Sequence, residues 1–226
     1  MKWFWYLRAA LYSALNTAYK RRPLAAAVAI FLGGLVSWGG FNWSLELSNT
    51  EQFCISCHVM ETFVFQEYKE TIHYRNRTGV RASCPDCHVP QEWVHKVIRK
   101  VQATQELFHW LRGSISTAEK FEAKRLTLAR HVWDGMAATD SRECRNCHDI
   151  GFMAAESQAK VAGRMHELAK NWQFTCIDCH KGIAHTLPKG FDQNAVLDLI
   201  HDRLETEKFD CRQCHKGMAG RRTEDG

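Results

Sequence analysis

Cysteine and histidine recur in this sequence in one fixed pattern, Cys-x-x-Cys-His, which occurs five times and uses all ten cysteines. The five copies are Cys54-Ile-Ser-Cys57-His58, Cys84-Pro-Asp-Cys87-His88, Cys144-Arg-Asn-Cys147-His148, Cys176-Ile-Asp-Cys179-His180 and Cys211-Arg-Gln-Cys214-His215. This pattern is the attachment signature of c-type haem. Its two thiols can add to the two vinyl groups of one porphyrin, and the adjoining imidazole is then placed to ligate the iron. The sequence therefore predicts five covalently attached haems, each with the histidine of its motif as an iron ligand.

Zinc sites and disulfide frameworks are the two other chemistries that use closely spaced cysteines. Neither requires a histidine directly after every second cysteine, and all five copies have one. The repetition therefore favours haem over both alternatives.

Seven further histidines are available as distal ligands, on the side of the iron opposite the motif histidine. A filled distal position suits an electron carrier, because it prevents other molecules from binding the iron. Four of these histidines lie near haem motifs, and we expect them to ligate iron: His73, His166, His185 and His201. The other three lie on predicted amphipathic helices, where we expect solvent-facing or propionate-pairing roles: His95, His109 and His131.

Met60 stands two residues after His58 and offers a thioether sulfur to the first iron. Methionine is also a common packing residue, so both interpretations stay open. A methionine ligand would raise the reduction potential of that haem. The first haem is thus expected to be chemically distinct from the rest.

Residues 24–43 carry no charge over twenty positions, which is long enough for a helix to cross a bilayer core of about 30 Å. Lys20, Arg21 and Arg22 precede this run, and the positive-inside rule places that end in the cytoplasm. The chain from about Ser44 onward is then outside. A cleaved signal peptide is the alternative, but its apolar region is normally about 7–15 residues long and ends at small residues, whereas this run ends at Trp43.

The rest of the chain predicts a mainly α fold, with a haem-packed domain and little strand. Apolar residues recur at helical spacing in two helices that pack together within 91–139, in 153–171 and in 194–207. Gly113 is expected to end the first helix of 91–139, and Ser116 to open the second with a capping box. The predicted divisions are a cytoplasmic interfacial segment (1–23), a transmembrane anchor (24–43), a four-haem domain (44–190), a fifth-haem extension (191–219) and a disordered tail (220–226).

The formal charge of +5 is not interpreted as a nucleic-acid signal. Each haem adds two propionates, which surplus Lys and Arg can neutralise. We therefore expect a lipid bilayer and redox partners, and no nucleic acid.

Several strings resemble the NapC/NirT family of membrane-anchored c-type quinol dehydrogenases, which includes NrfH and CymA. They are Cys54-Ile-Ser-Cys57-His58-Val-Met60, Thr71-Ile-His-Tyr74, Arg77-Thr-Gly-Val-Arg-Ala-Ser-Cys84-Pro-Asp-Cys-His-Val-Pro90, Glu143-Cys-Arg-Asn-Cys-His148 and Cys176-Ile-Asp-Cys-His-Lys-Gly-Ile-Ala-His185. The resemblance covers about residues 20–190. It implies a four-haem module in the bacterial inner membrane, with its haem domain in the periplasm, that takes electrons from quinol and passes them to a periplasmic reductase or soluble cytochrome.

The resemblance also implies roles for single residues. It places Met60 on haem one, His73 on haem four, His166 on haem two and His185 on haem three, and it brings Asp86 close to haem one at the quinol pocket. Quinol oxidation releases protons, so a pocket needs an acceptor such as a carboxylate. Asp86 is the acceptor we expect, with Arg77 or Arg81 as the cation that keeps it ionised; pairing with propionates is the alternative for both arginines.

The fifth motif departs from the four-haem pattern. TorC-type relatives carry a fifth haem on a much longer carboxy-terminal domain than the segment available here. Two other functions therefore stay open beside quinol dehydrogenation: a tethered relay fed by another membrane subunit, and a multihaem reductase acting on a small substrate, which the spare histidines disfavour. The residues leave the oligomeric state open, and a homo-oligomer is compatible with them.

Overall fold

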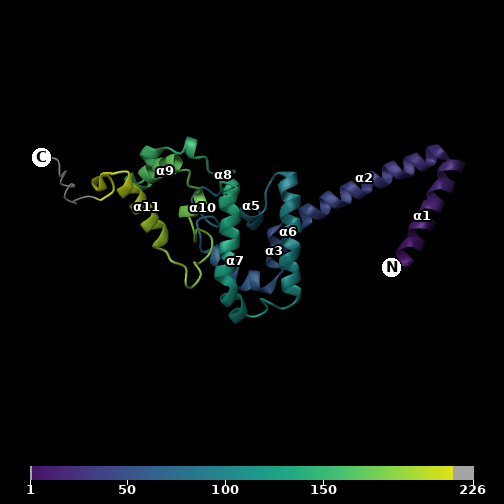
Figure 1. Ribbon diagram of the computed structural model, residues 1–226, viewed down its shortest axis with the longest axis horizontal. Coiled ribbons are helices and arrows are strands. Elements are labelled where there is room, and N and C mark those ends of the chain that lie inside the picture. Colours follow the sequence, from purple (N-terminus) through teal and green to yellow (C-terminus); the bar gives the residue numbers. More distant parts are fainter. Residues whose placement is uncertain (1, 216–226) are drawn as a thin grey trace. The chain divides into compact units, whose positions relative to one another are not determined.

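The computed structural model describes residues 2–215, which form helices joined by loops with no strand among them (Figure 1). Two compact units are present, one up to Asn49 and one from Thr50 onward. The helices are α1 (Lys2–Arg21), α2 (Pro23–Leu47), α3 (Glu51–Ile55), the π-helical turn η1 (Met60–Val64), α4 (Phe65–Lys69), α5 (Cys84–His88), α6 (Trp93–Leu111), α7 (Ala118–Ala138), α8 (Arg142–Arg145), the 3-10 turns η2 (Ile150–Phe152) and η3 (Ala155–Ser157), α9 (Lys160–Trp172), α10 (Cys176–Cys179), α11 (Ala195–Thr206) and the 3-10 turn η4 (Cys211–Gln213). The predicted mainly α class is confirmed. The predicted disordered tail, 220–226, lies outside the described residues.

The amino-terminal unit consists of two helices that meet at Arg22. Arg22 has a non-helical backbone, with φ of −145° and ψ of 74°, because the proline that follows disfavours helical geometry at the residue before it. Pro23 then opens α2, where its missing N–H costs nothing. At 25 residues, α2 is longer than the predicted anchor and is apolar enough to cross a membrane.

Four of the five haem motifs lie on or next to short capped helices. A side-chain oxygen before the motif accepts a hydrogen bond from a backbone N–H in the first turn at Thr50, Ser83, Thr175 and Asp210. Motif three is different, because Ser141 precedes α8 in the left-handed conformation, with φ of 50°. Helices of four or five residues are not stable by themselves, so these caps are expected to matter more here than in long helices.

The helices α6 and α7 confirm the prediction of two helices within 91–139, but they do not pack extensively on each other as expected. They are two long arms joined by the loop 112–117 (Figure 1). Gly113 ends the first arm with φ of +67°, as predicted. The cap of the second arm is Thr117, whose hydroxyl accepts a hydrogen bond from the Lys120 N–H, rather than Ser116.

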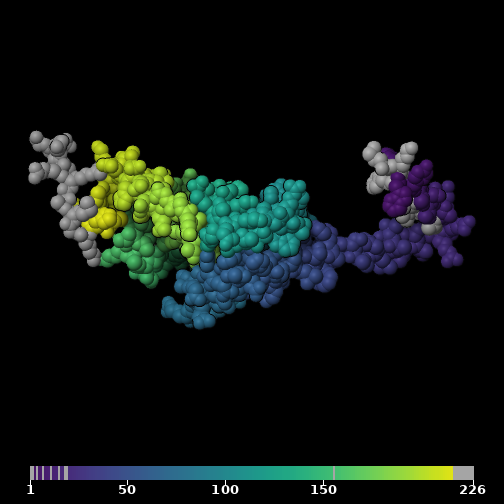
Figure 2. All heavy atoms as spheres, turned by 90° about the horizontal axis from the view of Figure 1, so that it is seen from below, coloured from purple at the N-terminus to yellow at the C-terminus, as the bar shows by residue number. Residues whose placement is uncertain are grey.

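The carboxy-terminal helix α11 packs on α9. Leu168, Trp172 and Ile200 form a buried cluster, with partly buried apolar side chains around it. The indole N–H of Trp172 donates a hydrogen bond of 2.8 Å to Glu207, just after α11. Figure 2 shows α11, in yellow, seated on α9, in green. The bounds predicted for α11 were close to those observed. The helix predicted over 153–171 begins only at Lys160, as α9, because residues 153–159 contain a 3-10 turn instead.

We predict that Ile200→Ala loosens this carboxy-terminal unit. The side chain is 8% exposed, so its truncation leaves a cavity and costs about 2–5 kcal/mol. Limited proteolysis should then cut within residues 191–210 faster than in the wild type. Leu199→Ala is the matched control, because Leu199 is 54% exposed. Equal cleavage rates in the two variants would contradict the packing described here.

Candidate haem-binding sites

Each Cys-x-x-Cys-His motif folds as about one helical turn. In motifs three, four and five the N–H of the histidine donates to the carbonyl of the first cysteine, at 2.8–2.9 Å. This turn brings cysteines three positions apart onto one face. The two thiols of a motif can therefore reach the same edge of one porphyrin.

Four histidine pairs face each other in the structure, and each pair contains one motif histidine. The ring centroids are 6.2 Å apart for His73 and His148, 6.2 Å for His88 and His185, 6.0 Å for His166 and His180, and 6.1 Å for His201 and His215. The narrow range of these four separations points to a common spacer between the rings.

A haem iron between the two rings would account for this separation. Metal–imidazole bonds are about 2 Å long, so two rings bonded on opposite sides of one metal have centres about 6 Å apart. The residues present therefore fit haem.

The observed pairs differ from those that the family resemblance implied. His73 faces His148 of motif three, His185 faces His88 of motif two, and His166 faces His180 of motif four. The resemblance implied motif four for His73, motif three for His185 and motif two for His166. The chain folds back between motifs, so the pairing follows the loops and not the order of motifs. His201 faces His215 of motif five.

Burial favours the neutral imidazoles that metals bind. It lowers the pKa of His88 to about 4, with the nearby His185 adding to the effect. Burial also lowers the pKa of His180 and of His185. A neutral ring keeps a lone pair available for a metal at neutral pH. Outside the pairs, His95, His109 and His131 are exposed on the two long arms.

Successive motifs adjoin in space. The thiols of Cys54 and Cys84 lie close together, and their interaction lowers the pKa of Cys54 to about 7 and raises that of Cys84. Cys144 lies close enough to raise the pKa of Cys87, after the larger effect of burial. The fully buried Ser141 hydroxyl accepts a hydrogen bond of 3.1 Å from Ile177 N–H and so ties motif three to motif four. Motifs one to four thus form a continuous series.

Motif one differs from the others, because no histidine ring among the described residues faces His58. Met60 opens the π-helical turn η1 directly after the motif, with 38% of its surface exposed. The motif itself begins seven residues after α2 ends. Met60 therefore remains the candidate for the second ligand.

The segment that carries His73 is held by aromatic residues and one ion pair. Tyr68 is buried, and its hydroxyl donates to the His73 carbonyl at 3.1 Å. Arg81 lies 4.2 Å from the ring centre of Tyr74 and bonds both oxygens of Glu51 at 2.6 Å. The carboxylate partner of Arg81 is thus Glu51, just before motif one, and not Asp86 as expected. Nothing in the sequence indicates this pair, because its members are 30 residues apart.

The loop that carries His185 is fixed by a second ion pair that sequence reasoning missed. Glu67 pairs with Arg125 and accepts a hydrogen bond of 2.9 Å from the N–H of Thr186. Arg125 donates to the carbonyl of Thr186, also at 2.9 Å. Both charged side chains are largely buried. These contacts join α4 and α7 to the residue after His185 and so set the position of that ring.

Asp86 has a structural role in this fold. Its carboxylate accepts hydrogen bonds from the N–H and hydroxyl of Ser83, at 2.7 and 2.6 Å, and completes a capping box. Asp178 of motif four makes the same box with Thr175. Asp86 is nevertheless exposed, as is Arg77 in the loop before the motif.

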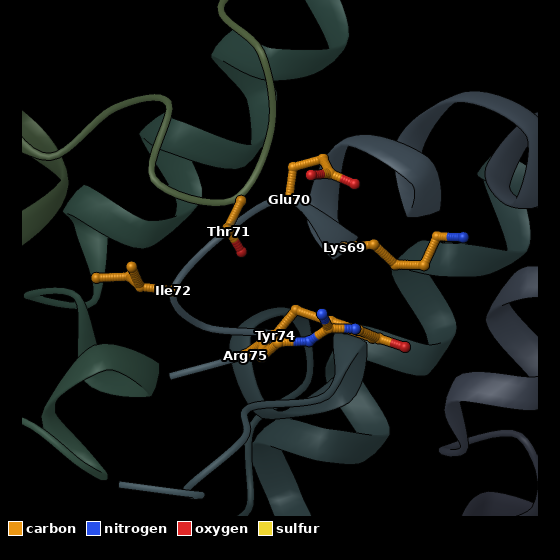
Figure 3. A pocket seen from close by; sticks show the side chains of 6 residues that line it. All are labelled: Lys69, Glu70, Thr71, Ile72, Tyr74 and Arg75. Carbon is orange, nitrogen blue, oxygen red and sulfur yellow. The ribbon is translucent and has the colours of Figure 1, made fainter. Parts of the chain in front are cut away.

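A cavity of about 510 Å³ lies along the segment after α4 (Figure 3). Its lining residues are Lys69, Glu70, Thr71, Ile72, Tyr74 and Arg75. Three of these six side chains are charged, whereas pockets for small organic molecules are mostly apolar. This cavity is therefore a poor candidate for a quinol pocket.

Paired thiols on helical turns, with imidazoles facing each other across the width of one metal, define a c-type cytochrome, a protein of electron transport. The profile described as "NapC/NirT cytochrome c family, N-terminal region" matches residues 17–190. The chain belongs to the NapC/NirT cytochrome c family.

Individual relatives agree with this assignment. The chain is 60% identical over 162 residues to the denitrification system component NirT of Stutzerimonas stutzeri, covering 72% of this chain and 81% of NirT. It is 56% identical over 158 residues to the cytochrome c-type protein NapC of Escherichia coli K12, covering 70% and 79%. Against TorY of Escherichia coli O157:H7 the identity is 40% over 177 residues, covering 76% and 47%. No solved structure matches the chain significantly.

We predict that Glu67→Ala frees His185 and changes the haem that motif two attaches. Without the carboxylate, Arg125 and the Thr186 N–H lose their common partner, and a charge is left largely buried. Electron paramagnetic resonance of the oxidised protein should show a new high-spin signal. Glu122→Ala is the control, because Glu122 also pairs with Arg125 but is a residue of α7 itself. An unchanged low-spin spectrum in Glu67→Ala would contradict the role of this ion pair.

Proposed function

We propose that this protein is a membrane-anchored pentahaem cytochrome that oxidises membrane quinol and relays electrons to a periplasmic reductase. The observation that carries the proposal is the series of adjoining motifs one to four, together with the facing histidine pairs of motifs two to five. The first motif, nearest in sequence to the apolar helix α2, is the one whose histidine faces no other histidine among residues 2–215. A series of sites whose first member differs from the rest suits a quinol-fed electron carrier.

The ligands for each haem follow from this arrangement. The cysteines of each motif attach the porphyrin, and His58 with Met60, His88 with His185, His148 with His73, His180 with His166, and His215 with His201 ligate the irons. Bound haem supplies reversible one-electron transfer. Filled distal positions keep small molecules away from the metal, so direct reduction of a small substrate is disfavoured. The fifth pair lies beyond residue 190, where the family match ends.

We predict five haems per chain by pyridine haemochrome analysis of the purified protein. Replacing both Cys211 and Cys214 by serine should lower the count to four and leave the spectrum otherwise low-spin, because the other facing pairs do not involve α11. Four haems in the wild type, or no loss in the double variant, would show that motif five does not attach haem.

Quinol oxidation also requires a path for protons, because each quinol releases two of them with its two electrons. We propose Asp86 as the acceptor, since it is the exposed carboxylate of the motif that adjoins motif one. Arg77 is the cation we assign to the same pocket. Arg81 contributes through its pair with Glu51, which fixes the loop between motif one and motif two.

The orientation follows from charge. Lys20, Arg21 and Arg22 precede α2 and keep that end of the helix in the cytoplasm, which places the haem domain in the periplasm. Electrons would then enter at the first motif, from quinol in the outer leaflet, and leave toward a soluble acceptor. We assign α1 to the cytoplasmic interface.

We predict that Asp86→Asn slows reduction of the oxidised protein by quinol by about a hundredfold, as expected for the loss of a proton acceptor. The haem α-band, followed anaerobically after mixing, measures the rate. Asp178→Asn is a matched control, because it removes the same capping box from motif four. Met60→Ala should also slow the reaction, since it removes the proposed second ligand of haem one.

The outcomes separate two functions. If Asp86→Asn and Asp178→Asn are equally fast with quinol, Asp86 only caps its helix. If dithionite reduces the wild-type protein but quinol does not, the protein is a tethered relay fed by another membrane subunit. The capping box of Asp86 is the observation that favours this second function, because it explains the residue without any quinol.

A further inference from the structure

The proposed distal histidines differ in what their Nδ1 atoms contact. His166 Nδ1 lies 2.6 Å from the side-chain oxygen of Gln158, and His201 Nδ1 lies 2.8 Å from the carbonyl oxygen of Leu197. The Nδ1 atoms of His73 and His185 have no such partner among the described residues. Among the described residues, His166 is thus the one distal histidine whose Nδ1 contacts another side chain. This contact can therefore be removed by a substitution.

This contact fixes the tautomer of His166. An amide oxygen has lone pairs and no proton, so it can only accept, and Nδ1 must carry the hydrogen. The other ring nitrogen, Nε2, is then unprotonated and has its lone pair free. An acceptor on Nδ1–H also draws that proton away, which makes Nε2 the stronger electron donor.

The local fold holds Gln158 in place. It lies two residues before α9, directly after the 3-10 turn Ala155–Ser157, and this turn contacts α9. The chain therefore folds back along the helix, and an eight-residue separation becomes a direct contact with His166. Both side chains are partly buried, so water competes weakly for the hydrogen bond.

We propose that Gln158 is a positioning residue for haem four: it holds His166 in the tautomer that binds iron and keeps the reduction potential of that haem low. A stronger donor ligand favours oxidised iron, so strengthening this hydrogen bond lowers the potential and removing it raises the potential. The inference rests on the proposed function only in taking His166 as a haem ligand.

The test compares two variants of the full, haem-loaded protein. Gln158→Leu removes the acceptor at similar size and should shift one midpoint potential upward. Gln158→Glu replaces it with a charged, stronger acceptor and should shift the same midpoint downward. Potentials are measured by redox titration with dithionite and mediators, and the low-spin signals by electron paramagnetic resonance. Gln193→Leu, at an exposed position outside every motif, is the matched control and should leave that midpoint unchanged.

Two further results decide the inference. His166→Ala identifies haem four, because the haem that becomes high-spin must be the one whose midpoint the Gln158 variants shift. Shifts in the same direction for Gln158→Leu and Gln158→Glu, or no shift in either, would overturn the proposal. If His166→Ala leaves every haem low-spin, the inference fails. The titration uses no quinol, so a failure of quinol oxidation would leave the role of Gln158 standing.

Discussion

The fold depends on one geometric constraint: imidazole rings from different segments must stand opposite each other across the width of a metal. Four pairs satisfy it, at 6.0–6.2 Å. Two of the pairs join segments that are far apart in sequence, so loops and ion pairs must hold the backbone within narrow limits. Two ion pairs hold such loops in place, Glu67 with Arg125 and Glu51 with Arg81. The loops and ion pairs thus fix the distances between the histidine rings.

The polypeptide provides little core of its own. Among the described residues, eight hydrophobic side chains are buried, whereas α6 alone exposes apolar residues such as Val94, Ile98 and Leu107. Folded domains gain most of their stability from apolar surface removed from water. Porphyrins attached to the Cys-x-x-Cys-His motifs would add apolar surface that the buried side chains do not provide.

The features that could be predicted from the sequence are those that depend on neighbouring residues alone. The motif cysteines, their histidines, the long helices and the end of α6 at Gly113 all follow from spacing and residue type. Sequence reasoning could not find where distant segments meet. The rings beside His73, His166 and His185 belong to other motifs than the family resemblance implied, and Arg81 pairs with Glu51. Nothing near Glu67 in the sequence indicates Thr186, which is 119 residues away. Contacts of this kind depend on how loops close, and periodicity carries no information about that.

The packing of α11 on α9 has a consequence for any shortened form of this protein. Trp172 and Leu168 belong to the region that matches the family, yet the helix that covers them lies beyond residue 190. A chain shortened to residues 17–190 would present an indole and a leucine to water, and exposed apolar surface of this kind favours association between molecules. The end of the family match is therefore not the boundary of a structurally independent domain.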